Sequence, residues 1–73
     1  MVNSNILSEF KKVYQNKRVR NIRNNEVYSV LDILNNSMDT SEKYKVDFQL
    51  QPILGGASFL QDELYFLANY KLI

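Results

Sequence analysis

The sequence predicts a small α+β domain in which two or three helices pack on a short antiparallel sheet or strand pair. The expected element order is roughly helix, optional strand, helix, strand and helix. Three patterns lead to this prediction: helical spacing of apolar residues near the N-terminus and in 26–35, strict alternation of apolar and polar residues in 44–51, and a very apolar C-terminal stretch, 59–73. With 73 residues, the chain should form one domain, 1–73, near the lower size limit for a single core.

Apolar residues at helical spacing predict a first helix that runs from Asn3 or Ser4 to about Gln15 or Asn16. The side-chain oxygen of Asn3 or Ser4 can accept a hydrogen bond from a free backbone N–H of the first turn. The residues that form the apolar stripe are Ile6, Leu7, Phe10, Val13 and Tyr14.

The next stretch, 17–23 (KRVRNIR), breaks the apolar stripe of the first helix. It fits either a short edge strand or an irregular basic arm. In both cases Val19 and Ile22 should contact the core.

Residues 26–35 should form a second helix. Asn24 and Asn25 form a break and a cap before it, and Glu26 places a negative charge at the helix N-terminus. Its apolar stripe consists of Val27, Val30, Leu31 and Leu34. The polar stretch 38–43 should follow it as a loop.

The clearest strand is 44–50, where Tyr44, Val46, Phe48 and Leu50 alternate with polar residues. Pro52 should end the strand because it lacks a backbone N–H, and Gly55-Gly56 should reverse the chain. The strand needs a pairing partner, which could be the basic arm, a strand in the C-terminal stretch, or the same strand of a second copy.

The motif GGAS at 55–58 lies where backbone N–H groups can hold a phosphate. The Lys and the third Gly of nucleotide-binding loops are missing, so a simple turn is favoured.

The C-terminal stretch should form a third helix over 59–70, because Ser58 and Gln61 match a capping box. A hairpin whose second strand is LYFLANYKLI is the alternative. As a helix, the stretch has two adjacent stripes, which are Leu60, Leu64, Leu67 and Lys71 and, beside them, Phe59, Glu63, Phe66 and Tyr70. So broad an apolar face must be covered by the rest of the chain or by a second copy, which favours a homodimer.

The residue inventory argues against catalysis and against cofactors. The chain has no Cys and no His, so it lacks disulfides, the usual zinc, haem and iron–sulfur ligands, and the common general base. The adjacent Asp62 and Glu63 would diverge by about 100° on a helix. Asp39, Glu42 and Asp47 lack the ligand spacing of a calcium loop. We therefore expect no catalytic residues, no metal, no cofactor and no small-molecule substrate.

Charge is unevenly distributed along the chain. Residues 1–25 carry six basic residues against Glu9, a net charge of +5, and 26–73 carry three lysines against seven acids, a net charge of −4. The six basic residues are Lys11, Lys12, Lys17, Arg18, Arg20 and Arg23. They could contact nucleic acid, or they could form a solvated face that pairs with an acidic protein surface, including that of a second copy.

These features predict a cytoplasmic, non-enzymatic regulatory or inhibitory protein-interaction module that is a homodimer and occupies a surface of a macromolecular partner. By analogy of size and composition, phage or plasmid modulators and immunity-type proteins fit this description, and the Asn, Lys and Ile content suggests a low-GC bacterium or phage. The alternative is a nucleic-acid-binding regulator that uses Lys11 to Arg23. The expected partner interface consists of Tyr65, Phe66, Tyr70, Leu72 and Ile73. The start of the chain lacks a secretory-signal pattern, and no apolar run is long enough to span a membrane.

Overall fold

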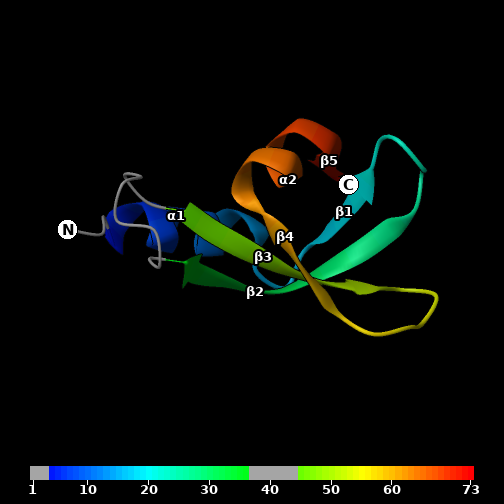
Figure 1. Cartoon of the computed structure of the whole chain (residues 1–73), viewed down its shortest axis with the longest axis horizontal. Coiled ribbons are helices and arrows are strands. Elements are labelled where there is room, and N and C mark those ends of the chain that lie inside the picture. Colours follow the sequence, from blue (N-terminus) through cyan, green and yellow to red (C-terminus); the bar gives the residue numbers. More distant parts are fainter. Residues whose placement is uncertain (1–3, 37–44) are drawn as a thin grey trace.

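The computed structural model describes residues 4–36 and 45–73, which form two helices and a five-stranded antiparallel sheet (Figure 1). In chain order the elements are α1 (Ser4–Tyr14), β1 (Arg18–Asn21), β2 (Val27–Asn36), β3 (Lys45–Pro52), β4 (Phe59–Asp62), α2 (Glu63–Asn69) and β5 (Tyr70–Leu72). The strand order in the sheet is β4-β3-β2-β1-β5. The predicted α+β class is therefore confirmed, but the element order is dominated by strands. The expected cap at Asn3, the loop 38–43 and Tyr44 lie outside the described residues.

The first helix matches its prediction and ends where expected. Asn16 adopts a positive φ of 63°, which stops the helix and turns the chain toward the sheet. The backbone N–H of Asn16 then donates to the carbonyl of Val30 at 2.8 Å, and the N–H of Val30 donates to the carbonyl of Lys17 at 2.8 Å. Side chains Leu7, Phe10 and Tyr14 pack against the core.

Residues 18–21 form a strand, which decides between the two predicted alternatives, but this strand is not at an edge. β1 pairs with β2 on one side and with β5 on the other. Its residues alternate between exposed and buried, with Val19 fully buried. Ile22 is exposed, so only Val19 makes the core contact that was expected of both residues.

The predicted second helix is wrong, because 27–36 form the long strand β2. The pairing register shifts between Val30 and Asp32, so β2 carries a β-bulge. Tyr28, Val30 and Ile33 are all buried, and the bulge places one extra residue between Val30 and Ile33. The resulting spacing of two and then three imitates a helical stripe, and this is why periodicity misled the prediction.

β3 confirms the predicted strand and extends it to Pro52. It pairs with β2 and with β4, so one of the three expected partners, a strand in the C-terminal stretch, is correct. Gly55 and Gly56 reverse the chain with φ values of 109° and 116°, which residues with a Cβ rarely adopt. The motif at 55–58 is therefore a turn, and it leads into a strand rather than a helix.

The single helix predicted for 59–70 is instead a strand, a short helix and a second strand. Asp62, rather than Ser58, caps the helix: its carboxylate accepts a hydrogen bond from the Tyr65 backbone N–H at 2.8 Å. The rival hairpin is also wrong for most of the stretch, although Tyr70–Leu72 are extended and pair with β1.

The sheet is curled, because α2 connects its two edge strands. Four inter-strand gaps of about 4.8 Å would separate β4 from β5 by about 19 Å in a flat sheet. The seven residues of α2 span only about 10 Å. Consistent with curling, the Tyr70 hydroxyl on β5 donates to Gln61 Oε1 on β4 at 3.3 Å.

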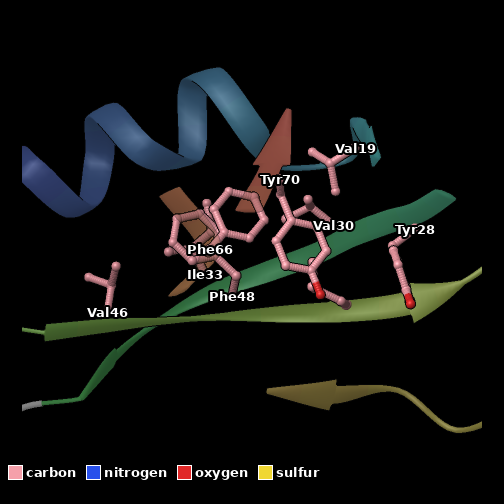
Figure 2. Close-up of a cluster of buried hydrophobic side chains, with 9 residues drawn as sticks. Val19, Tyr28, Val30, Ile33, Val46, Phe48, Phe66 and Tyr70 are labelled. Atoms are coloured by element: carbon pink, nitrogen blue, oxygen red, sulfur yellow. The ribbon is translucent and has the colours of Figure 1, made fainter. Parts of the chain in front are cut away.

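Both helices pack on the same face of this sheet, and aromatic rings fill the space between them (Figure 2). Phe48 of β3 stacks on Phe66 of α2 with ring centroids 3.7 Å apart and planes at 5°. Phe10 and Tyr14 of α1 meet Phe48 edge to face, each at 5.5 Å. Tyr14 also meets Phe66 at 5.1 Å. These rings join α1, α2 and the sheet into one core.

Truncating Phe66 should destabilise the fold far more than truncating its neighbour. Phe66→Ala removes a fully buried ring and leaves a cavity, which costs about 3–5 kcal/mol of unfolding free energy. Leu67→Ala, one residue along α2, removes a half-exposed side chain and should cost less than about 1 kcal/mol. Urea denaturation followed by circular dichroism measures both variants, and equal losses would contradict this description of the core.

Candidate functional site

One apolar side chain of α2 is buried, and its apolar neighbours on the same helix are exposed. Phe66 is fully buried, whereas Leu64 is 78% exposed and Leu67 is 46% exposed. A single short helix lying on a sheet can bury only one side of itself. Of the two C-terminal stripes, the one containing Phe66 and Tyr70 therefore faces the core, and the leucine stripe faces outward.

Further exposed apolar side chains lie on the elements next to α2. The Ile22 N–H, just after β1, donates to the carbonyl of Asn69 at the end of α2 at 2.8 Å. The N–H of Ile73, just after β5, donates to the carbonyl of Arg18 at 3.2 Å. The first hydrogen bond keeps the end of β1 beside α2, and the second joins the end of β5 to the start of β1. Figure 1 shows α2, β1 and β5 in the same part of the molecule. We define the C-terminal apolar surface as Ile22, Leu64, Tyr65, Leu67, Leu72 and Ile73, all of which are exposed.

The structure divides the five residues predicted as a partner interface. Tyr65, Leu72 and Ile73 are exposed, but Phe66 and Tyr70 are buried in the core and are not available to a partner. Sequence reasoning missed Ile22, Leu64 and Leu67. Both leucines lie in the stripe with Leu60 and Lys71, and that charged member is the signal that could have identified the outward side.

Apolar exposure is not confined to this surface. Other exposed large apolar residues lie near α1 and β2, or around the turn between β3 and β4, and they are Val13, Leu31, Leu34, Ile53, Leu54, Phe59 and Leu60. The C-terminal apolar surface differs from them in its place around α2, whose Leu64 and Leu67 are turned away from the core.

The six basic residues predicted as one segment fall into separate groups. Lys11 and Lys12 lie on α1, where their ammonium groups are 3.9 Å from Asp32 Oδ1 and 3.7 Å from Glu9 Oε2, respectively. Arg23 lies in the turn between β1 and β2. Lys17, Arg18 and Arg20 lie at or just before β1. The helix lysines thus have acidic neighbours, whereas within 4–36 and 45–73 no ion pair involves Arg18 or Arg20 of β1.

A compact cationic cluster forms on the face of the sheet opposite the helices. Arg18 and Arg20 alternate with buried Val19 and Asn21, so their side chains leave β1 on this outer face. The register places Arg20 directly opposite Lys71 of β5. Among the described residues, no carboxylate lies within ion-pair distance of these three side chains. We define Arg18, Arg20 and Lys71 as the outer-face cationic cluster. Lys71 was missed because only the β1–β5 pairing brings it there.

The acidic residues of the C-terminal half have structural roles or lie elsewhere. Asp62 caps α2, and Glu63 Oε1 accepts a hydrogen bond from the Val46 N–H at 3.3 Å. Asp47 lies directly opposite Asp62 on the outer face. Within 4–36 and 45–73 no three His, Cys, Asp or Glu side chains are grouped as metal ligands. Asp39 and Glu42 fall outside the described residues.

The environment of Tyr70 alters the ionisation of its hydroxyl. Burial raises its pKa above the usual 10.0, neighbouring Tyr28 and Tyr65 raise it further, and a hydrogen bond with Asn21 lowers it. Its ring packs on Phe66 with centroids 5.0 Å apart. These contacts give Tyr70 a structural role between β5 and α2.

Comparisons with protein-family models, with curated proteins and with solved structures found no match to this chain. In the part of the chain that the structure describes, neither helix has the length and apolar character needed to cross a lipid bilayer. The residues themselves therefore carry the functional argument.

Stability should fall at alkaline pH through Tyr70. Because its pKa is raised in the folded state, its contribution is complete below pH 10.0 and is lost as pH rises through the folded-state value. Urea midpoints measured from pH 8 upward should therefore decline above about pH 10. Tyr70→Phe cannot ionise and should show a shallower decline, and identical slopes for the two proteins would refute the assignment.

Proposed function

We propose that this protein is a non-enzymatic protein-interaction module that forms a homodimer and regulates or inhibits a macromolecular partner by occupying its surface. The observation that carries the proposal is the C-terminal apolar surface. Leu64, which is 78% exposed, lies on α2, and Ile73, which is 64% exposed, is tied to β1 by the hydrogen bond from its N–H to the Arg18 carbonyl. Exposed apolar residues gathered on a rigid scaffold are typical of binding sites.

The energy available from this surface suits self-association. Burying each of its four aliphatic side chains on α2 and β5 would gain on the order of 1–2 kcal/mol. In a two-fold symmetric dimer each residue counts twice, which gives on the order of 8–16 kcal/mol. Association costs about 4–15 kcal/mol in lost motion, so the gain and the cost are of similar size and the dimer should be weak and reversible. An interface of that strength can also exchange for a different protein.

The residue inventory supports binding rather than catalysis. The chain has no Cys and no His to serve as nucleophile or neutral-pH base. Asp62 and Glu63 already accept backbone hydrogen bonds at the start of α2 and at β3. Tyr70, whose ionisation is perturbed, is packed among other rings and has its hydroxyl bonded to Gln61.

Nucleic-acid binding is the second candidate, and one specific observation favours it. The outer-face cationic cluster brings Arg18 and Arg20 together with Lys71 on the face of the sheet opposite α2 and its exposed leucines. The two functions are compatible, since a dimeric regulator can use one surface for assembly and the other for nucleic acid.

Sedimentation equilibrium tests the self-association. The mass of the wild-type protein should rise with concentration from the 8.6 kDa of one chain toward about 17 kDa, the mass of two. Leu64→Ser combined with Leu67→Ser should weaken the dimer at least tenfold, because both exposed leucines lie on the proposed interface.

Leu54→Ser provides the matched control. Leu54 is 90% exposed in the turn after β3, away from α2 and β5, so its loss should leave the dimer unchanged. A wild-type mass that stays at 8.6 kDa at every concentration would refute the dimer. Equal weakening by Leu54→Ser and by the α2 variant would show that the assembly uses another surface.

A further inference from the structure

We propose that the outer-face cationic cluster, Arg18, Arg20 and Lys71, binds the phosphate backbone of nucleic acid without reading its bases. This site lies on the face of the sheet opposite the helices and shares no residue with the C-terminal apolar surface. The site also differs from the basic segment Lys11 to Arg23. It leaves out the lysines of α1 and includes Lys71 from β5.

The first argument is that the cluster is unfavourable without a ligand. Arg20 and Lys71 lie directly opposite each other in an antiparallel pair, where Cβ atoms are about 4.5–5.5 Å apart and like charges destabilise the sheet. Arg18 is diagonal to Lys71 on the same face. Within the described chain no carboxylate is close enough to relieve this repulsion. A multiply charged anion bound across the three side chains would relieve it.

The second argument is the layout of hydrogen-bond donors. Arg18 and Arg20 are two residues apart on one strand, so their side chains leave the sheet about 7 Å apart. Ser29 lies directly opposite Arg18 and adds a hydroxyl donor beside the guanidinium groups. Planar guanidinium groups match phosphate oxygens in a bidentate manner, and Lys71 adds a point charge.

Two features favour nucleic acid over an acidic peptide as the ligand. They are the charge density of nucleic acid and the position of the aromatic rings of the sheet. Each strand of duplex DNA carries one negative charge per about 3.4 Å of axis, about twice the density of carboxylates spaced about 7 Å apart on one side of an extended acidic peptide. The aromatic rings of the sheet, Tyr28, Phe48 and Tyr70, point to the opposite face and into the core (Figure 2). Among the described residues, the outer face of β1 and β5 thus has no aromatic ring on which a base could stack, which favours contacts to phosphates.

The size of the cluster sets the expected number of contacts. It offers the three cations Arg18, Arg20 and Lys71, so three phosphate contacts per subunit are expected. The logarithm of the binding constant should then fall with the logarithm of salt concentration with a slope of about −2.7 for duplex DNA.

Fluorescence anisotropy with a labelled duplex of about 20 base pairs, titrated at several salt concentrations below physiological strength, tests the proposal. Wild-type protein should bind with the stated slope per subunit. Arg20→Gln combined with Lys71→Gln should bind at least tenfold more weakly and with a slope near −0.9. The matched control is Lys11→Gln combined with Lys12→Gln, which removes the same charge from α1 and should leave affinity and slope close to wild type.

Three results would overturn the proposal. The first is the absence of binding at low salt, and the second is an equal loss in the α1 control, which would mean that only net charge matters. The third is tighter binding of poly-glutamate than of the duplex, which would assign the cluster to an acidic protein.

The urea midpoint of Arg20→Gln, Lys71→Gln should match or exceed that of wild type, so lost binding would not reflect unfolding. The Leu64→Ser, Leu67→Ser variant should keep the slope per subunit, so this proposal and the dimer can fail separately.

Discussion

The stack of Phe48 on Phe66 is the contact on which the rest of the structure depends. It fastens α2 to the middle of the sheet with ring centroids only 3.7 Å apart. Because α2 is too short to cross a flat sheet, fastening it there requires the sheet to curl and directs the chain back to β1. The pairing of β5 with β1 follows, and with it the position of Lys71 opposite Arg20. Both candidate surfaces are therefore consequences of one aromatic contact.

The elements that sequence reasoning predicted correctly are those with local signals. The first helix, β3 and the Gly55-Gly56 turn are specified by spacing, alternation and backbone freedom within a few residues. β2 was missed because a bulge changed its spacing from two to three residues, and a bulge depends on a pairing that the strand alone does not reveal. The C-terminal stretch was missed because its apolar residues satisfy helical spacing across a boundary between strand and helix.

The candidate sites show the same division between local and long-range information. Charge counting found Arg18 and Arg20, but the cluster also needs Lys71, which is about fifty residues away and is placed by strand register. Counting also grouped Lys11 and Lys12 with them, although α1 directs those lysines toward acidic neighbours. Similarly, aromatic content alone suggested Phe66 and Tyr70 as interface residues. The curl of the sheet buries both, and the plain leucines beside them remain at the surface.

The return of β5 to β1 also governs the order in which this chain can fold. β1 is made early but gains its second neighbour only when the last strand in the sequence has formed. On a ribosome, a chain still lacking α2 and β5 has Phe48 without its stacking partner and β1 with one open edge, a state prone to mispairing. Folding of this domain is therefore complete only after β5 has been made, and its long-range closure makes it slower than that of a helical bundle of equal length.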